Sequence, residues 1–169
     1  MDPELTGVGG FEGVELLQKL HLFRRLSFDE TTRLGGIIQY LDLPADSLVI
    51  DQNALGDALF VIARGEVRVT RETETPGQLP AAEEIGLLKE GELFGEMSLI
   101  DDVLTSARVT TTISCRLLKL PRDRFEALLA ADEKLAIKVY RSFCSTLSDR
   151  LRRTSSLLAH SQALPLSVR

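Results

Sequence analysis

The chain has 169 residues, a formal net charge of −5 and a pI near 5.1, and 44% of its residues are hydrophobic. This balance excludes a disordered chain, and the acidic charge argues against binding along a nucleic-acid backbone. No apolar run is long enough to span a bilayer and no signal peptide is visible, so we predict a cytoplasmic protein with no membrane or nucleic-acid partner. Cys115 and Cys144 give neither a disulfide framework nor the spacing of a metal site.

The start of the chain predicts a leader followed by two helices. Residues 1–12 contain glycines and no periodic pattern, so we expect a flexible leader there. Leucines at helical spacing follow and predict the first of the N-terminal helices, which together occupy residues 13–37. Ser27 and Glu30 form a capping box, which predicts that the second helix begins just after Ser27.

Residues 38–120 contain many short strand patterns separated by turn signals, which is typical of a sandwich or jelly roll. Val67 and Val69 alternate with polar neighbours, as expected for a strand with one buried face. The stretch from 72 to 82 carries two prolines and a glycine and predicts a mobile hairpin loop. With the flanking helices, the pattern predicts an α+β fold built on an antiparallel β-roll.

Residues 121–158 predict the C-terminal helices, and residues 159–169 predict a flexible tail. Pro121 suits a helix start, because the N–H group that it lacks has no partner there. A second, longer helix carries apolar residues at alternating spacings of three and four, as in a heptad seam. We predict that this seam forms a homodimer or contacts a partner protein; its residues are Ile137, Tyr140, Cys144, Leu147 and Leu151.

The stretch from Gly91 to Thr111 is the candidate site. Gly95 lets the backbone approach a ligand closely, and free N–H groups of a short helical turn after it suit an anion. Glu96 comes next, and its carboxylate can accept hydrogen bonds from a diol. These residues could hold a sugar phosphate. The alternative is a tight turn in which Glu96 is merely solvated.

Two blocks of the sequence carry a resemblance. Phe94-Gly-Glu-Met-Ser-Leu-Ile100 followed by Thr105-Ser-Ala107 resembles the phosphate-binding cassette of the cyclic nucleotide-binding domain family. That family includes catabolite activator proteins and the regulatory subunits of protein kinase A. The block from Asn53 to Val69 is similar to the family's β-roll signature. The resemblance implies a cyclic nucleotide-binding-like domain over residues 13–158, with a cupin-like jelly roll over residues 38–120. It also implies a regulatory function, and cyclic AMP or cyclic GMP as the ligand.

The resemblance also implies which residues bind. Glu96 would hold the ribose hydroxyl, the backbone from Gly95 to Ser98 would meet the phosphate, and Thr105 and Ser106 would line the remaining edge. The predicted cassette residues are Phe94, Gly95, Glu96, Met97, Ser98, Thr105 and Ser106. The predicted pocket wall consists of Val69, Arg71, Ile85 and Leu87.

One position departs from the family's pattern. Thr105 stands where the cassette has the arginine that pairs with the cyclic phosphate. Arg108 follows three residues later, so on a strand it points to the opposite face. Arg71 shares the inward parity of Val69 and is the candidate to replace the missing cation. The sequence therefore predicts that ordinary cyclic nucleotides bind weakly or in an altered way.

Two function hypotheses remain. The first is a non-catalytic sensor whose roll binds a cyclic nucleotide and moves the long helix. The second is a protein-protein interaction or dimerisation module that keeps only the fold. We predict no enzymatic activity, no required cofactor and no metal, because His21 and His160 stand alone and no P-loop, zinc spacing or nucleophile elbow is present.

Overall fold

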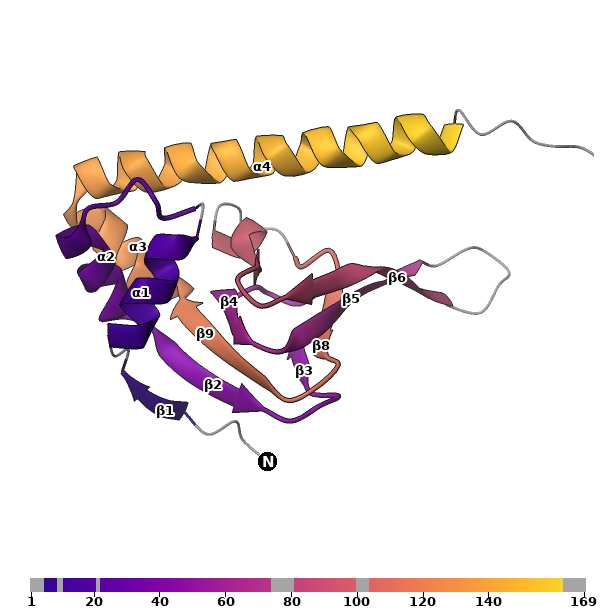
Figure 1. The fold of residues 1–169 in the computed structure, drawn as a ribbon, viewed down its shortest axis with the longest axis horizontal. Coiled ribbons are helices and arrows are strands. Elements are labelled where there is room, and N and C mark those ends of the chain that lie inside the picture. Colours follow the sequence, from indigo (N-terminus) through magenta and orange to yellow (C-terminus); the bar gives the residue numbers. More distant parts are fainter. Residues whose placement is uncertain (1–4, 9–10, 21, 74–80, 100–103, 163–169) are drawn as a thin grey trace, which may run out of the picture.

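The computed structural model describes residues 5–8, 11–20, 22–73, 81–99 and 104–162, which fold into a β-roll with helices at one end and along one side (Figure 1). The strands of the first half are β1 (Leu5–Val8), β2 (Gln39–Leu43), β3 (Leu48–Ile50), β4 (Ala58–Arg64) and β5 (Glu66–Thr73). The later strands are β6 (Ala81–Lys89), β7 (Leu93–Phe94), β8 (Arg108–Thr111) and β9 (Cys115–Pro121). The helices are α1 (Phe11–Lys19), α2 (Phe28–Gly35), the short 3₁₀ helix η1 (Glu96–Leu99), α3 (Arg122–Ala131) and α4 (Glu133–Gln162).

The strands form two sheets that close into the roll. One has the order β1-β2-β9-β4-β7 and the other the order β3-β8-β5-β6. Every pairing between neighbouring strands is antiparallel. The predicted α+β fold, an antiparallel β-roll with N-terminal helices and a long C-terminal helix, is confirmed.

Strand β4 is buried on both faces, because it lies between the two hydrophobic cores of the molecule. Leu59 and Val61 belong to the core that the sheet forms with the helices. Phe60 and Ile62, on the other face, belong to the core inside the roll. The alternation of side chains along a strand thus assigns neighbouring residues of β4 to different cores.

The predicted capping box at the start of α2 is confirmed. The Glu30 N–H donates to the Ser27 hydroxyl at 3.2 Å, and the Ser27 N–H donates to the Glu30 carboxylate at 2.7 Å. The same carboxylate accepts two hydrogen bonds from Lys138 of α4, at 2.7 and 2.9 Å. These bonds hold the pKa of Glu30 below its usual value, the one from Lys138 having the largest effect.

The boundaries of three predicted segments are corrected. The leader predicted over residues 1–12 is wrong for Leu5–Val8, because this segment pairs with β2, and for the start of α1 at Phe11. The predicted hairpin loop is shorter than expected, since β5 continues to Thr73 and β6 begins at Ala81; residues 74–80 lie outside the described residues. The predicted tail begins too early, because α4 continues to Gln162.

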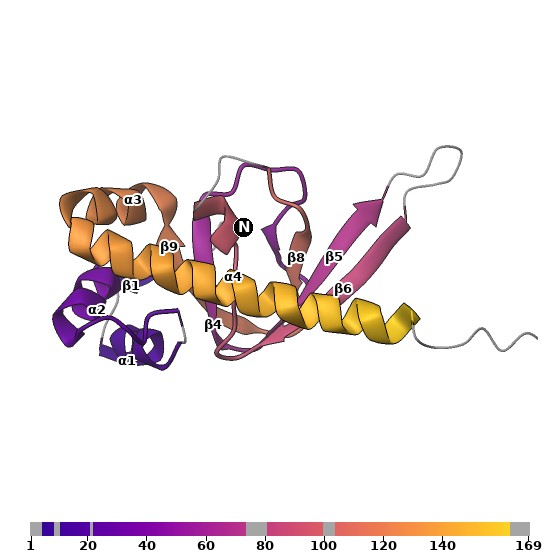
Figure 2. The same ribbon diagram turned by 90° about the horizontal axis from the view of Figure 1, so that it is seen from above.

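Helix α4 begins beside α2 and α3 and then runs above the roll (Figures 1 and 2). Its inner face carries Leu135, Val139 and Phe143, which are buried, and the ring of Phe143 meets Phe125 of α3 edge-on at 6.4 Å. Four residues of the predicted seam are exposed, namely Ile137, Tyr140, Cys144 and Leu151, and Leu147 is half-buried. Among the described helices, none is long and apolar enough to cross a membrane.

Candidate functional site

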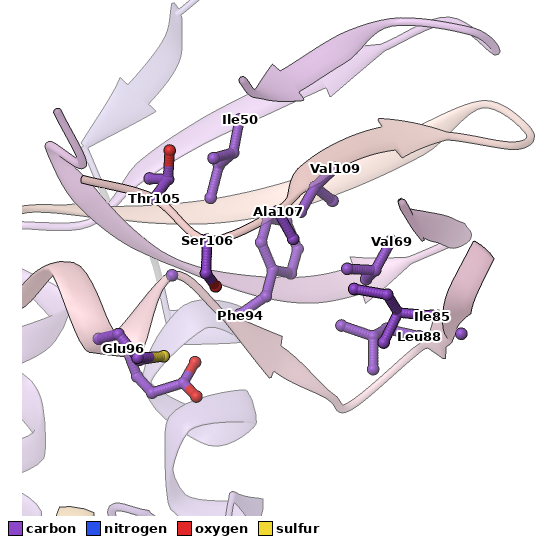
Figure 3. Close-up of a pocket in the computed structure, with 13 residues that line it drawn as sticks. Ile50, Val69, Ile85, Leu88, Phe94, Glu96, Thr105, Ser106, Ala107 and Val109 are labelled. Carbon is purple, nitrogen blue, oxygen red and sulfur yellow. The ribbon is translucent and has the colours of Figure 1, made fainter. Parts of the chain in front are cut away.

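The candidate site is a pocket of about 290 Å³ inside one side of the roll, between η1, the β5–β6 hairpin and the start of β8 (Figure 3). Its lining comes from five stretches of the chain, at residues 50, 69, 85–88, 94–97 and 105–109, which the closure of the roll brings together. The lining residues are Ile50, Val69, Ile85, Gly86, Leu88, Phe94, Gly95, Glu96, Met97, Thr105, Ser106, Ala107 and Val109.

Most of the wall is apolar. Val69 and Val109 are directly opposite each other on β5 and β8, so their side chains share the inward face. The ring of Phe94 stacks on Phe60 of β4 with the centroids 5.2 Å apart and the planes at 12°. A flat or aliphatic group could bury its surface against this wall, which is the kind of lining that small-molecule pockets have.

Two predicted wall residues lie elsewhere. Leu87 is opposite Arg68 on the outer face, whereas Leu88, opposite the buried Val67, lines the pocket. The cause is a bulge: the register of β5 with β6 shifts between Val69 and Thr70, which leaves Ile85 as an extra residue. The bulge breaks the parity on which the prediction of Leu87 rested.

Arg71 also stays outside the lining. It is exposed, two residues beyond Val69 on β5, and it is opposite Glu83 of β6. The predicted role of Arg71 in the wall therefore stays a prediction, which requires its side chain to turn inward.

The turn before η1 brings the backbone close to β4. Gly95 has φ +81, and a Cβ at this position would be 2.7 Å from the carbonyl oxygen of Ala58, so only glycine fits. Glu96 then begins η1 and is only 4% exposed, which excludes the alternative of a solvated turn. Met97, by contrast, is exposed at the rim, and the side chain of Ser98 lies outside the described residues.

The hydroxyl of Thr105 fastens a loop rather than facing the pocket. It accepts a hydrogen bond from the Ala54 N–H at 3.0 Å and donates to the carbonyl of Asp51. Two backbone bonds reinforce the contact: Asn53 donates to Thr105 at 2.8 Å, and Thr105 donates to Ala54 at 2.9 Å. Figure 3 shows the Thr105 and Ser106 side chains pointing in opposite directions, Ser106 toward the side where Glu96 lies.

Arg108 is occupied by two carboxylates away from the pocket. Its guanidinium contacts Asp51 at 2.8 Å and Glu72 at 2.7 Å. The contact with Asp51 is the main cause that raises the pKa of Arg108 and lowers that of Asp51. Arg108 lies between the lining residues Ala107 and Val109 in sequence, so it occupies the opposite face of the strand, as the sequence predicts.

Sequence reasoning missed five lining residues. Ala107 and Val109 could have been found from the alternation of β8, because they share a face. Gly86 and Leu88 could not, because the bulge reverses the expected parity of β6. Ile50 lines the pocket only because β3 pairs with β8, a contact that no local pattern reveals.

The described residues bring together a carboxylate, a serine hydroxyl and an apolar wall, without the grouping of nucleophile and base that catalysis needs. No cluster of three or more metal-ligating side chains occurs among the residues that the structure describes. The arrangement suits binding of a small molecule that presents hydrogen-bond donors at one end and an apolar surface at the other.

The chain matches a protein-family model over the region that contains the pocket. The family model described as "Cyclic nucleotide-binding domain" matches residues 40–132, which is more than half of the chain. The matched region contains the whole pocket lining, from Ile50 to Val109.

Individual relatives are similar in sequence and in structure. The chain is 34% identical over 131 residues to a cyclic AMP receptor protein of Thermus thermophilus, covering 78% of this chain and 57% of the relative. It is 28% identical over 114 residues to a cAMP-dependent protein kinase regulatory subunit of Dictyostelium discoideum, covering 68% and 35%. A solved cyclic nucleotide-binding domain of Methylobacillus flagellatus superposes with a TM-score of 0.75 at 28% identity, covering 93% and 85%. The chain spans less than two thirds of the length of the curated relatives it matches.

Proposed function

Because the chain belongs to the cyclic nucleotide-binding domain family, we propose that it is a non-catalytic sensor module that binds ordinary cyclic AMP and cyclic GMP weakly. The observation that carries this proposal is Thr105, a neutral side chain at the position where the family's cassette has the phosphate-pairing arginine. Its hydroxyl is bound to the loop at Asp51 and Ala54, so it has no proton left to give to a phosphate without breaking that contact.

In this proposal the cassette keeps its remaining roles. The buried carboxylate of Glu96 accepts a hydrogen bond from the ribose hydroxyl. The backbone from Gly95 to Ser98 faces the phosphate. Ser106 lines the edge, and the base lies against Val69 and the other apolar side chains of the wall. A ligand held in this way could change how η1 and the helices pack, which is how a sensor would transmit binding.

The expected loss of affinity follows from the missing charge. A hydrogen bond to a charged group contributes about 1.5–3 kcal/mol, so its absence weakens binding by roughly ten- to a hundredfold. A buried phosphate without a counter-charge adds a desolvation cost of the same sign.

The test is calorimetric titration of the wild type and Thr105→Arg with cyclic AMP and cyclic GMP under one salt condition. We expect weak binding by the wild type and tighter binding by the variant. Thr105→Val is the matched control, because it also breaks the hydroxyl contacts with the loop but brings no charge. Tight wild-type binding that Thr105→Arg leaves unchanged would refute the proposal.

A second candidate function is an interaction or dimerisation module that works through α4. The observation in its favour is an apolar line on the helix that the other described residues leave exposed. Ile137 is 52% exposed, Tyr140 47% and Leu151 68%, while Cys144 is exposed and Leu147 is half-buried. Seam residues at heptad spacing are suited to packing against a second helix.

A further inference from the structure

The described part of the pocket lining is acidic. Of the thirteen described lining residues, Glu96 is the one with an ionisable side chain, and it is 4% exposed. None of the thirteen is lysine, arginine or histidine. Residues 100–103 lie outside the described residues, and their sequence, Ile-Asp-Asp-Val, contains no basic residue either. Among the described lining residues, an anion entering this pocket would therefore meet a carboxylate and no cation.

The basic residues nearest in the chain are held elsewhere. Arg108 is on the opposite face of β8, where Asp51 and Glu72 neutralise it. Arg71 has the inward parity of Val69, but it is exposed and is not one of the lining residues. For either arginine to neutralise a phosphate in the pocket, its guanidinium group would have to leave its present position.

The polar groups that do line the pocket suit a neutral ligand. Figure 3 shows Glu96 and Ser106 at one end and Val69, Ile85 and Leu88 at the other. A buried carboxylate is an acceptor of hydrogen bonds and binds groups that bring their own protons, such as a pair of ring hydroxyls. The apolar end gains from burying a flat ring, whatever the charge at the other end.

Taking the pocket as the ligand site, as the proposed function does, we infer that it prefers a neutral nucleoside to the corresponding cyclic phosphate. The sugar hydroxyls donate to Glu96, the base lies along the apolar wall, and no phosphate is present to be desolvated or repelled. A cyclic phosphate of the same nucleoside has the same base but adds one negative charge beside Glu96. The preference thus arises from the lack of a cation among the described lining residues, as well as from the Glu96 carboxylate and the apolar wall.

The experiment is a calorimetric titration of the wild-type chain with adenosine and guanosine and with their matched phosphates, cyclic AMP and cyclic GMP. We expect at least one nucleoside to bind about tenfold tighter than its own cyclic phosphate. The affinity for the nucleoside should not change between low and high salt, because a neutral ligand has no net charge to screen. The 2′-deoxynucleoside should bind more weakly, since it lacks one of the hydroxyls.

The variant Glu96→Gln distinguishes a specific effect of the Glu96 charge on ligand choice from misfolding of the protein. The neutral amide keeps one acceptor but removes the negative charge, so nucleoside affinity should fall while cyclic phosphate affinity should hold or rise. A variant that is merely misfolded would weaken both ligands together. Arg71→Gln should leave nucleoside binding unchanged.

The outcomes distinguish this inference from the proposed function. Weak cyclic phosphate binding with no nucleoside binding would leave the proposed function in place and overturn the inference. Cyclic phosphate binding as tight as nucleoside binding would also overturn it, and its loss in Arg71→Gln would identify the replacement cation. No binding of any of the four compounds would overturn both and favour the interaction module.

Discussion

Replacing Thr105 by valine tests the contact between the cassette and the loop at Asp51 and Ala54. Valine keeps the branched shape and removes the hydroxyl, which makes one hydrogen bond as acceptor and one as donor. The two backbone bonds between the segments do not involve the side chain and should survive. The variant therefore isolates what the hydroxyl contributes.

The magnitude follows from the two lost bonds. A neutral hydrogen bond contributes about 0.5–1.5 kcal/mol, so two give about 1–3 kcal/mol. Ala54 is half-buried, so water can partly satisfy the N–H group that Thr105 leaves. We therefore expect Thr105→Val to lower the free energy of unfolding by about 1–2 kcal/mol.

The assay is urea unfolding of the wild type, Thr105→Val and Thr110→Val. Thr110 is also half-buried and lies on β8, and its side chain makes no hydrogen bond among those described, so its replacement should change stability by less than about 0.5 kcal/mol. A lower midpoint with an unchanged slope would report a true loss of stability. If Thr105→Val were as stable as Thr110→Val, the assignment of the hydroxyl to the loop contact would be wrong.

Two further predictions concern α4. Glu30→Gln should destabilise the fold by about 1 kcal/mol at neutral pH, measured by urea unfolding, because it weakens the bonds with Lys138. The folded-state pKa of Glu30 is lowered, so this contribution is present above its unfolded value of 4.5, and the difference between the proteins should vanish as pH falls through the folded-state pKa. The double variant Ile137→Glu and Leu151→Glu should convert a self-associating chain into monomers by light scattering, because charges would face the seam of a second copy.

A specific result would refute each of these two predictions. A stability difference for Glu30→Gln that is the same at pH 7 and at pH 3 would show that the ion pair is not its cause. Arg141 is exposed on α4 and lies outside the seam, so Arg141→Gln is the control. Like each seam substitution it lowers the net charge by one, but it should leave self-association intact. A wild type that is monomeric at high concentration would refute self-association through the seam.

Features encoded by neighbouring residues could be predicted from the sequence. The capping box of α2 needs only Ser27 and Glu30, and Gly95 marks the turn into η1 because its positive φ favours glycine. The antiparallel roll followed from strand lengths and turn signals, and the resemblance of the cassette added the location of the pocket.

Features that depend on distant partners could not be predicted. Leu5–Val8 has too few residues for a periodic pattern and is a strand only because β2 offers it an edge. Leu87 and Leu88 exchange faces because of a bulge whose position is set by the pairing with β5. The Thr105 hydroxyl has partners 51 and 54 residues earlier in the chain, so its contact with the loop depends on the closed roll.

The double burial of β4 has a consequence for how the molecule unfolds. Since Leu59 and Val61 serve one core while Phe60 and Ile62 serve the other, neither core can open without exposing apolar surface of the same strand. We therefore expect the roll and its helices to unfold as one cooperative unit, and the amide protons of β4 to exchange slowly with solvent.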